Sequence, residues 1–318
     1  MKIRITLVVL FLICSAKAQT ADAATVLELN QKVIASYQNG QLDEALKLAE
    51  KASELCLKVH GPNSLETAVA LTNLGTIQRE KRRFRESVQS LQRSLEIYRK
   101  TSAVPPGKIV DLLQSIAFSQ VLDGKKSEAE SSYLAAVNHA ETSFGSQGKQ
   151  NLVPILNLAQ FYARQRNFEK ADDFYLKSYG LALKHFGEES KEIEKIADSR
   201  VCLNTEDKRR DKLFQERYDT LFGVNRSKPE EIVNGKARNL IKPPYPQEAK
   251  NQRLTGIVKI RVKIDEHGNV SEAWSACGDG ILERASLDAA RMSKFSPTLL
   301  AGKPVKVSGV IIYRFTAQ

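Results

Sequence analysis

The sequence has few residues of the kinds that build catalytic centres. Among its 318 residues are four histidines, four cysteines, two methionines and one tryptophan. The histidines (His60, His139, His185 and His267) are scattered and show no metal-ligand spacing. There is no glycine-rich phosphate loop, no nucleophile elbow and no metal-spaced cysteine pair. These absences predict that the protein is not an enzyme and uses no cofactor and no metal.

Long hydrophobic runs are also missing, apart from one at the N-terminus. Lys2 and Arg4 precede an apolar run from Ile5 to Ala16, and Ala16-Lys17-Ala18 then supplies small residues. This order is typical of a secretory signal, so we expect residues 1–18 to be removed and the chain to be periplasmic. The run is shorter than the roughly 20 residues that a membrane-spanning helix needs. The alternative is an uncleaved anchor.

The remaining composition is ordinary for a soluble protein. The net charge is +11, but the basic clusters are mixed with acidic residues, and we expect no nucleic-acid partner after export. Membrane association would be peripheral or through a partner, and the oligomeric state stays open. After cleavage the cysteines are Cys56, Cys202 and Cys277, an odd and dispersed set that predicts no disulfide framework. Whether any two of them form a bridge stays open.

A period of 42 residues runs through most of the chain. Small residues recur at two positions of one helical face, seven residues apart, with a large residue between them in three of the four repeats. The first small residues are Ala45, Ser87, Ala129 and Ala171; the large ones are Leu91, Tyr133 and Tyr175; the second small ones are Ala52, Ser94, Ala136 and Ser178. This pattern predicts helix pairs packed side by side.

The repeat resembles a tetratricopeptide array of the 42-residue kind found in kinesin light chains. It predicts a mostly α-helical solenoid over residues 26–222, and the resemblance implies a groove that holds a protein partner. In peptide-binding relatives an asparagine contacts the ligand backbone at the positions of Asn73 and Asn157, whereas this sequence has Ser115 between them. The alternative is that these polar side chains simply lie on a solvated helix face.

The pattern changes after a linker predicted over residues 223–235. Helices are predicted near Pro246 and around Leu282 to Met292, and strands at 256–265, 269–276 and 303–315. This order predicts an α+β domain with a three-stranded antiparallel sheet and two helices over 236–318. Within the first strand Lys259, Arg261 and Lys263 alternate with apolar residues, so we expect them to form the solvated face of the sheet.

Several short motifs in this region occur together in order. They are Pro244-Tyr245-Pro246, Gly256-Ile257-Val258, Asp265 to Gly268, 287–290, Phe295 to Pro297, Gly302 to Val305 and Tyr313 to Phe315. Together they resemble a TonB C-terminal domain. The resemblance implies that a segment of an outer-membrane receptor, or of another envelope protein, adds as a strand beside the last strand. The implied contact residues are Lys306, Ser308, Val310, Ile312 and Arg314.

The two resemblances favour a periplasmic adaptor that holds one protein in its groove and docks another at its sheet edge. The alternative is a TonB-type energy transducer for outer-membrane transport, with the N-terminal segment retained as its anchor. In that family the anchor carries a histidine and a proline-rich spacer follows it. Here the apolar run contains no histidine and the repeats occupy the place of the spacer, so the adaptor is the preferred hypothesis.

Overall fold

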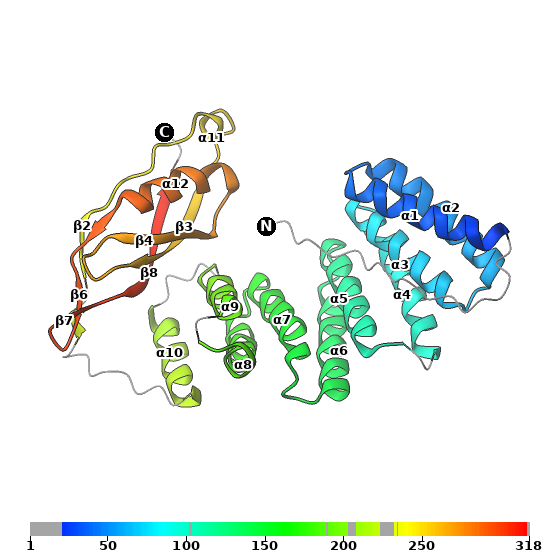
Figure 1. Ribbon diagram of the computed structural model, residues 1–318, viewed down its shortest axis with the longest axis horizontal. Helices are drawn as coiled ribbons and strands as arrows, with labels where there is room; N and C mark the ends of the chain where they lie inside the picture. Colours follow the sequence, from blue (N-terminus) through cyan, green and yellow to red (C-terminus); the bar gives the residue numbers. More distant parts are fainter. Residues whose placement is uncertain are drawn as a thin grey trace. The chain divides into compact units, whose positions relative to one another are not determined.

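The computed structural model describes residues 21–101, 104–188, 190–202, 208–222, 232–233 and 235–316. The predicted signal segment, residues 1–18, and most of the predicted linker lie outside these ranges. The α-helices are α1 (Ala21–Gln38), α2 (Leu42–His60), α3 (Leu65–Glu80), α4 (Phe84–Lys100), α5 (Pro106–Leu122), α6 (Lys126–Phe144), α7 (Leu152–Arg164), α8 (Phe168–Phe186), α9 (Lys191–Val201), α10 (Lys208–Phe222), α11 (Gln247–Asn251) and α12 (Gly280–Met292) (Figure 1). A short 3₁₀ helix, η1 (Lys149–Asn151), precedes α7.

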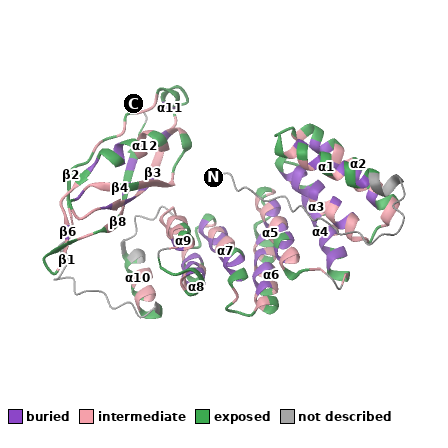
Figure 2. Ribbon diagram, viewed as in Figure 1, coloured by how far each residue is buried: buried purple, intermediate pink, exposed green. Residues whose placement is uncertain are grey.

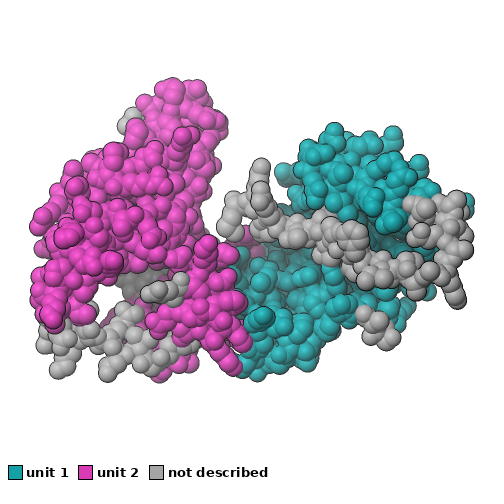
Figure 3. All heavy atoms as spheres, in the orientation of Figure 1, with its two compact units in different colours: residues 1–161 teal, residues 162–318 magenta. Residues whose placement is uncertain are grey.

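The chain forms two compact units, residues 1–161 and 162–318, which Figure 3 colours separately. The predicted 42-residue period is confirmed in the described helices. Every first and second small residue of the pattern is at most 1% exposed, and Leu91, Tyr133 and Tyr175 are also buried (Figure 2). At Gly75 an added Cβ would lie 2.7 Å from Leu91 Cγ. Small residues are therefore what lets neighbouring helices approach.

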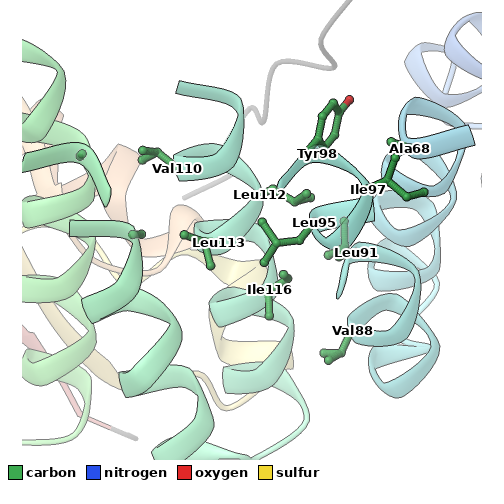
Figure 4. Close-up of a cluster of buried hydrophobic side chains, with 12 residues drawn as sticks. Ala68, Val88, Leu91, Leu95, Ile97, Tyr98, Val110, Leu112, Leu113 and Ile116 are labelled. Atoms are coloured by element: carbon green, nitrogen blue, oxygen red, sulfur yellow. The ribbon is translucent and has the colours of Figure 1, made fainter. Parts of the chain in front are cut away.

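The first unit has an apolar core shared by consecutive helices. Figure 4 shows side chains of α3, α4 and α5 turned toward one another, among them Leu91, Leu95 and Ile116. Hydroxyl groups close the remaining gaps, since Ser87 Oγ lies 2.9 Å from Ser119 Oγ and Ser94 Oγ donates to the Ala68 carbonyl at 2.7 Å. Each helix therefore packs mainly on its sequence neighbours, as stacked repeats do.

The turn inside each helix pair repeats as well. Gly40, Arg82, Gly124 and Arg166 follow one another at 42-residue steps, and all four have φ between 61° and 79°. This left-handed backbone favours glycine, yet two of the four residues are arginines. The period therefore fixes the turn conformation even where the residue type is unfavourable.

The C-terminal part of the second unit is an α+β domain, as predicted. Its strands are β1 (Ile232–Val233), β2 (Ala237–Asn239), β3 (Gly256–Ile264), β4 (Val270–Cys277), β5 (Lys294–Phe295), β6 (Thr298–Leu300), β7 (Lys303–Val305) and β8 (Val307–Phe315). The main sheet is antiparallel with the order β4-β3-β8, and two smaller sheets have the orders β1-β6-β7 and β2-β5. Among the described residues, β1 forms from two residues of the predicted linker.

One face of the main sheet carries the core of this domain. Val258, Ile260 and Val262 of β3 are at most 1% exposed and pack with Ile311 of β8 and Leu282 of α12. The β3–β4 turn is held by the carboxylate of Asp265, which accepts the backbone N–H of His267 at 2.9 Å and of Asn269 at 2.8 Å. These hydrogen bonds lower the Asp265 pKa, the one from the Asn269 backbone most strongly.

The prediction of one last strand over 303–315 is wrong in one respect. Residues Lys303–Val305 form β7, which pairs with β6, whereas Val307–Phe315 form β8, which pairs with β3. The chain changes sheets at Lys306. A continuous run of β-branched residues cannot reveal this change, because both strands use the same residue types.

Candidate partner-binding surfaces

β8 is an edge strand of the main sheet. Among the strands that the structure describes it pairs only with β3, in a register that runs from Gly256 opposite Phe315 to Ile264 opposite Val307. An edge strand presents unpaired backbone N–H and C=O groups to any extended segment that approaches it. The strand therefore offers a ready template for pairing with another chain.

The side chains of β8 alternate between the core and the surface, as the period of two predicts. Ile311, Tyr313 and Phe315 are buried, whereas Ser308, Val310, Ile312 and Arg314 are exposed. Val310 is 37% and Ile312 is 42% exposed, so two large apolar side chains of this edge strand face outward. Lys306 is exposed between β7 and β8, with its Nζ 3.9 Å from the Glu266 carboxylate. All five predicted contact residues thus lie on an accessible strip.

The prediction that Lys259, Arg261 and Lys263 form a solvated face is wrong for Lys259 and Arg261, whereas the side chain of Lys263 is 40% exposed. Lys259 is only 8% exposed, and its Nζ donates to the carbonyl of Val201, the last residue of α9, at 2.7 Å. Arg261 forms an ion pair with Asp198 of the same helix. The basic residues of β3 therefore hold a helix against the sheet.

Asp198 is the central group of this contact. One of its carboxylate oxygens pairs with Arg261, and the other accepts the indole N–H of Trp274 on β4 at 2.9 Å. Glu194, one turn earlier in α9, lies 3.4 Å from Nζ of Lys263, which also pairs with Glu272. The helix thus covers the β3–β4 part of the outer face, while Val310 and Ile312 on β8 stay exposed.

Sequence reasoning missed this docked helix, although a signal for it exists. Glu194 and Asp198 are four residues apart, so they lie on one face of a helix. They match the basic residues that alternate on β3, and Trp274 offers an N–H donor in the next strand. Complementary charge at matching spacing could have suggested the contact, but many surface helices carry such acidic pairs.

The two predicted groove residues lie on first helices of their repeats. Asn73 is on α3 and is 7% exposed, so most of its surface is already covered. Asn157 is on α7 and is half-buried, and its Nδ2 donates to Gln114 Oε1 on α5. The residue between them in the period, Ser115, donates to the Asp111 carbonyl of its own helix. The side-chain partner of Asn157 on α5 is therefore Gln114 and not Ser115.

In the ranges that the structure covers, no three His, Cys, Asp or Glu side chains gather as a metal site would require. None of the described helices is long and apolar enough to cross a membrane.

Packed helix pairs and a small sheet with an open edge are both typical of proteins that bind other proteins. Family models identify both parts. Tetratricopeptide repeat models match residues 22–100 and 155–185, and the model for the Gram-negative bacterial TonB protein C-terminal matches residues 241–317. The chain is a tetratricopeptide repeat protein with a TonB C-terminal domain. α9 lies between the matched regions, so neither model accounts for it.

Solved structures are similar in the helical part. The kinesin light chain TPR-like repeats from Podosopora anserina match with a TM-score of 0.52 and 15% identity, over 64% of this chain and 98% of that chain. Aspartyl phosphate phosphatase F from Bacillus subtilis matches with a TM-score of 0.50 and 10% identity, over 65% of this chain and 51% of that one. At these identities the similarity shows the fold alone. A search of curated proteins gave no match.

Proposed function

We propose that this protein is an exported adaptor of the bacterial envelope. Its repeats hold one protein partner, and its TonB domain docks a second protein, such as an outer-membrane receptor, by strand addition along β8. The observation that carries the proposal is the exposed apolar pair Val310 and Ile312 on an edge strand, inside a domain of the TonB family. Main-chain hydrogen bonds would supply affinity, and the alternating outward side chains would select the partner.

The strand-addition step can be tested with the full chain and a synthetic peptide from the periplasmic segment of an outer-membrane receptor. In the Val310→Lys/Ile312→Lys variant two charges replace the apolar contacts on the edge, so we expect affinity to fall by about tenfold or more. Ser271→Lys, on the opposite edge strand β4, is the matched control and should bind normally. Equal affinity of the double variant and the control, both folded by Trp274 fluorescence, would remove β8 as the docking edge.

The groove assignment needs a separate test. In an Asn73→Ala/Asn157→Ala variant we expect weaker capture of the repeat-bound partner from envelope extract, while the receptor peptide still binds. Because Asn73 is buried, circular dichroism must show that the helices persist. A variant that keeps its helices and captures the same partner would exclude these two residues as ligand contacts.

Export itself is tested at the N-terminus. If the signal is cleaved, sequencing of the protein from the periplasmic fraction begins at or near Gln19. An intact Met1 in the inner-membrane fraction would instead support the energy-transducer alternative, in which the N-terminal segment is the anchor. The two outcomes leave the strand-addition test unaffected, so the adaptor and the docking edge can be judged separately.

A further inference from the structure

Two cysteines meet where α9 docks on the sheet. Cys202 follows the last residue of α9, with its backbone N–H bonded to the Asp198 carbonyl at 3.0 Å, and Cys277 ends β4. The Cys202 thiol donates to the carbonyl oxygen of Ala276, the residue before Cys277, at 2.9 Å. Lys259, which lies opposite Cys277 in the β3–β4 register, donates to the carbonyl of Val201, the residue before Cys202. Cys202 thus lies beside Cys277, and closeness of the two residues is the first geometric requirement for a disulfide.

We propose that Cys202 and Cys277 form a disulfide that locks α9 onto the outer face of the main sheet. The contact does not depend on the sulfur atoms alone, because Lys259 donates to Val201 and Asp198 binds both Arg261 and Trp274. These interactions keep Cys202 beside Cys277 before any bond forms. Closing the bond is then an intramolecular step between groups already in place, which favours it strongly over pairing with a distant thiol.

The surroundings favour Cys277 as the group that reacts first. The neighbouring Cys202 thiol lowers the Cys277 pKa, and the nearby Lys259 ammonium also favours its thiolate. Cys56, by contrast, is fully buried in the first unit, and burial raises its pKa to about 11. Since the thiolate is the nucleophile, Cys56 should stay out of the reaction.

The oxidant is a protein or small-molecule disulfide. The Cys277 thiolate attacks one sulfur of that disulfide and expels the other as a thiolate, which leaves a mixed disulfide on Cys277. The Cys202 thiol then loses its proton and attacks Cys277 sulfur, which releases the second thiolate. The two protein thiols give up two electrons and two protons, and the oxidant becomes two thiols. In the cell this step rests on the proposed export, because disulfides persist in the periplasm and not in a reducing cytosol.

The bond is tested by incubating the purified full chain with oxidised glutathione, blocking free thiols and digesting the protein for mass spectrometry. We expect a linked peptide pair that contains Cys202 and Cys277 and disappears on reduction, with Cys56 blocked only after denaturation. Cys56→Ser is the matched control and should give the same pair, whereas Cys202→Ser should give none. Recovery of Cys202 and Cys277 as blocked or glutathione-bound thiols in the folded control would overturn the proposal.

The effect of the disulfide on α9 can be measured separately, without any binding partner. Hydrogen exchange of the amides in α9 should slow by about tenfold or more in the oxidised chain, because the bond removes open states of the helix. Dithiothreitol should reverse the effect in Cys56→Ser and have no effect in Cys202→Ser. Equal exchange in the oxidised and reduced chain would exclude a lock even if the bond forms. Neither readout uses the receptor peptide, so this proposal and the docking at β8 can fail independently.

Discussion

The helical repeats and the C-terminal domain are built from different kinds of contact. In the repeats each helix packs on neighbours in sequence, and a small residue every 42 positions sets the spacing. In the domain the sheet joins Gly256 to Phe315, and α9 reaches it through Asp198, which lies 63 residues before Arg261 and 76 before Trp274. The contacts within the repeats therefore recur along the chain, whereas each long-range contact of the domain occurs once.

The two regions also differ in what lies close to their glycine residues. At Gly75 in the repeats, the nearest atom to an added Cβ would be Leu91 Cγ at 2.7 Å, so a side chain and not the backbone would have to shift first. At Gly268 in the domain it would lie 2.0 Å from the backbone oxygen of Phe295, which cannot move without breaking the turn. Substitutions in the two regions should therefore differ in cost, and the following predictions run from the largest effect to the smallest.

Gly268→Ala should be the most damaging of these changes. Gly268 has φ of 86° and its missing Cβ makes room for the Phe295 backbone, so we expect a loss of about 3 kcal/mol in the unfolding free energy of the domain. Urea unfolding followed by Trp274 fluorescence measures it. Gly302→Ala, where φ is 76° but no atom lies within 4 Å, should cost only about 1 kcal/mol. Equal losses of stability at the two positions would show that the positive φ alone, and not the close contact, determines the cost of the substitution.

Asp198→Ala should break the contact between α9 and the sheet. It leaves the Arg261 guanidinium, whose side chain is 15% exposed, and the Trp274 N–H without their partner, at a cost of about 2 kcal/mol. Hydrogen exchange in α9 and urea unfolding both measure the loss. The control is Glu194→Ala, whose partner Lys263 is 40% exposed and keeps Glu272; its cost should stay below about 0.5 kcal/mol. A larger loss of stability in Glu194→Ala than in Asp198→Ala would show that Glu194, and not Asp198, mainly holds the helix on the sheet.

Gly75→Ala should destabilise the repeats only modestly. The new methyl group would lie 2.7 Å from Leu91 Cγ, and overpacking outweighs the gain in helix propensity by about 1 kcal/mol. Thermal unfolding followed by circular dichroism measures the change. Gly107→Ala, in α5 with no atom within 4 Å, should instead stabilise by about 0.5 kcal/mol. The opposite signs would show that Gly75 is kept for packing and not for flexibility.

The smallest expected effect is at the repeated turn. Arg82 has φ of 61°, so Arg82→Gly should relieve strain and stabilise the first unit by about 0.5 kcal/mol. Arg83→Gly is the matched control, because Arg83 has φ of −86° and gains nothing from glycine. Thermal unfolding of both variants tests the difference. A loss of stability in Arg82→Gly would mean that the arginine side chain contributes more than its backbone costs.

Periodicity is why most of the fold could be predicted. Small residues at 42-residue steps predict close helix packing whatever the rest of the sequence does, and Ala45, Ser87, Ala129 and Ala171 are all completely buried. Alternation with a period of two likewise predicted which side chains of β8 face outward. Both predictions use only the periods of helices and strands, which can be recognised within a short segment of sequence.

The sequence by itself thus determined the repeats, the α+β domain and the outward strip on β8. Only the tertiary structure decided what covers the other face of the sheet, and there the expectation of a solvated Lys259 and Arg261 failed. In the sequence, a charged residue on a strand has the same pattern of neighbours whether water or a helix covers it in the folded protein. The difference depends on whether Asp198 and Cys202, which are distant in the chain, pack against that face. No local sequence pattern indicates such a long-range contact.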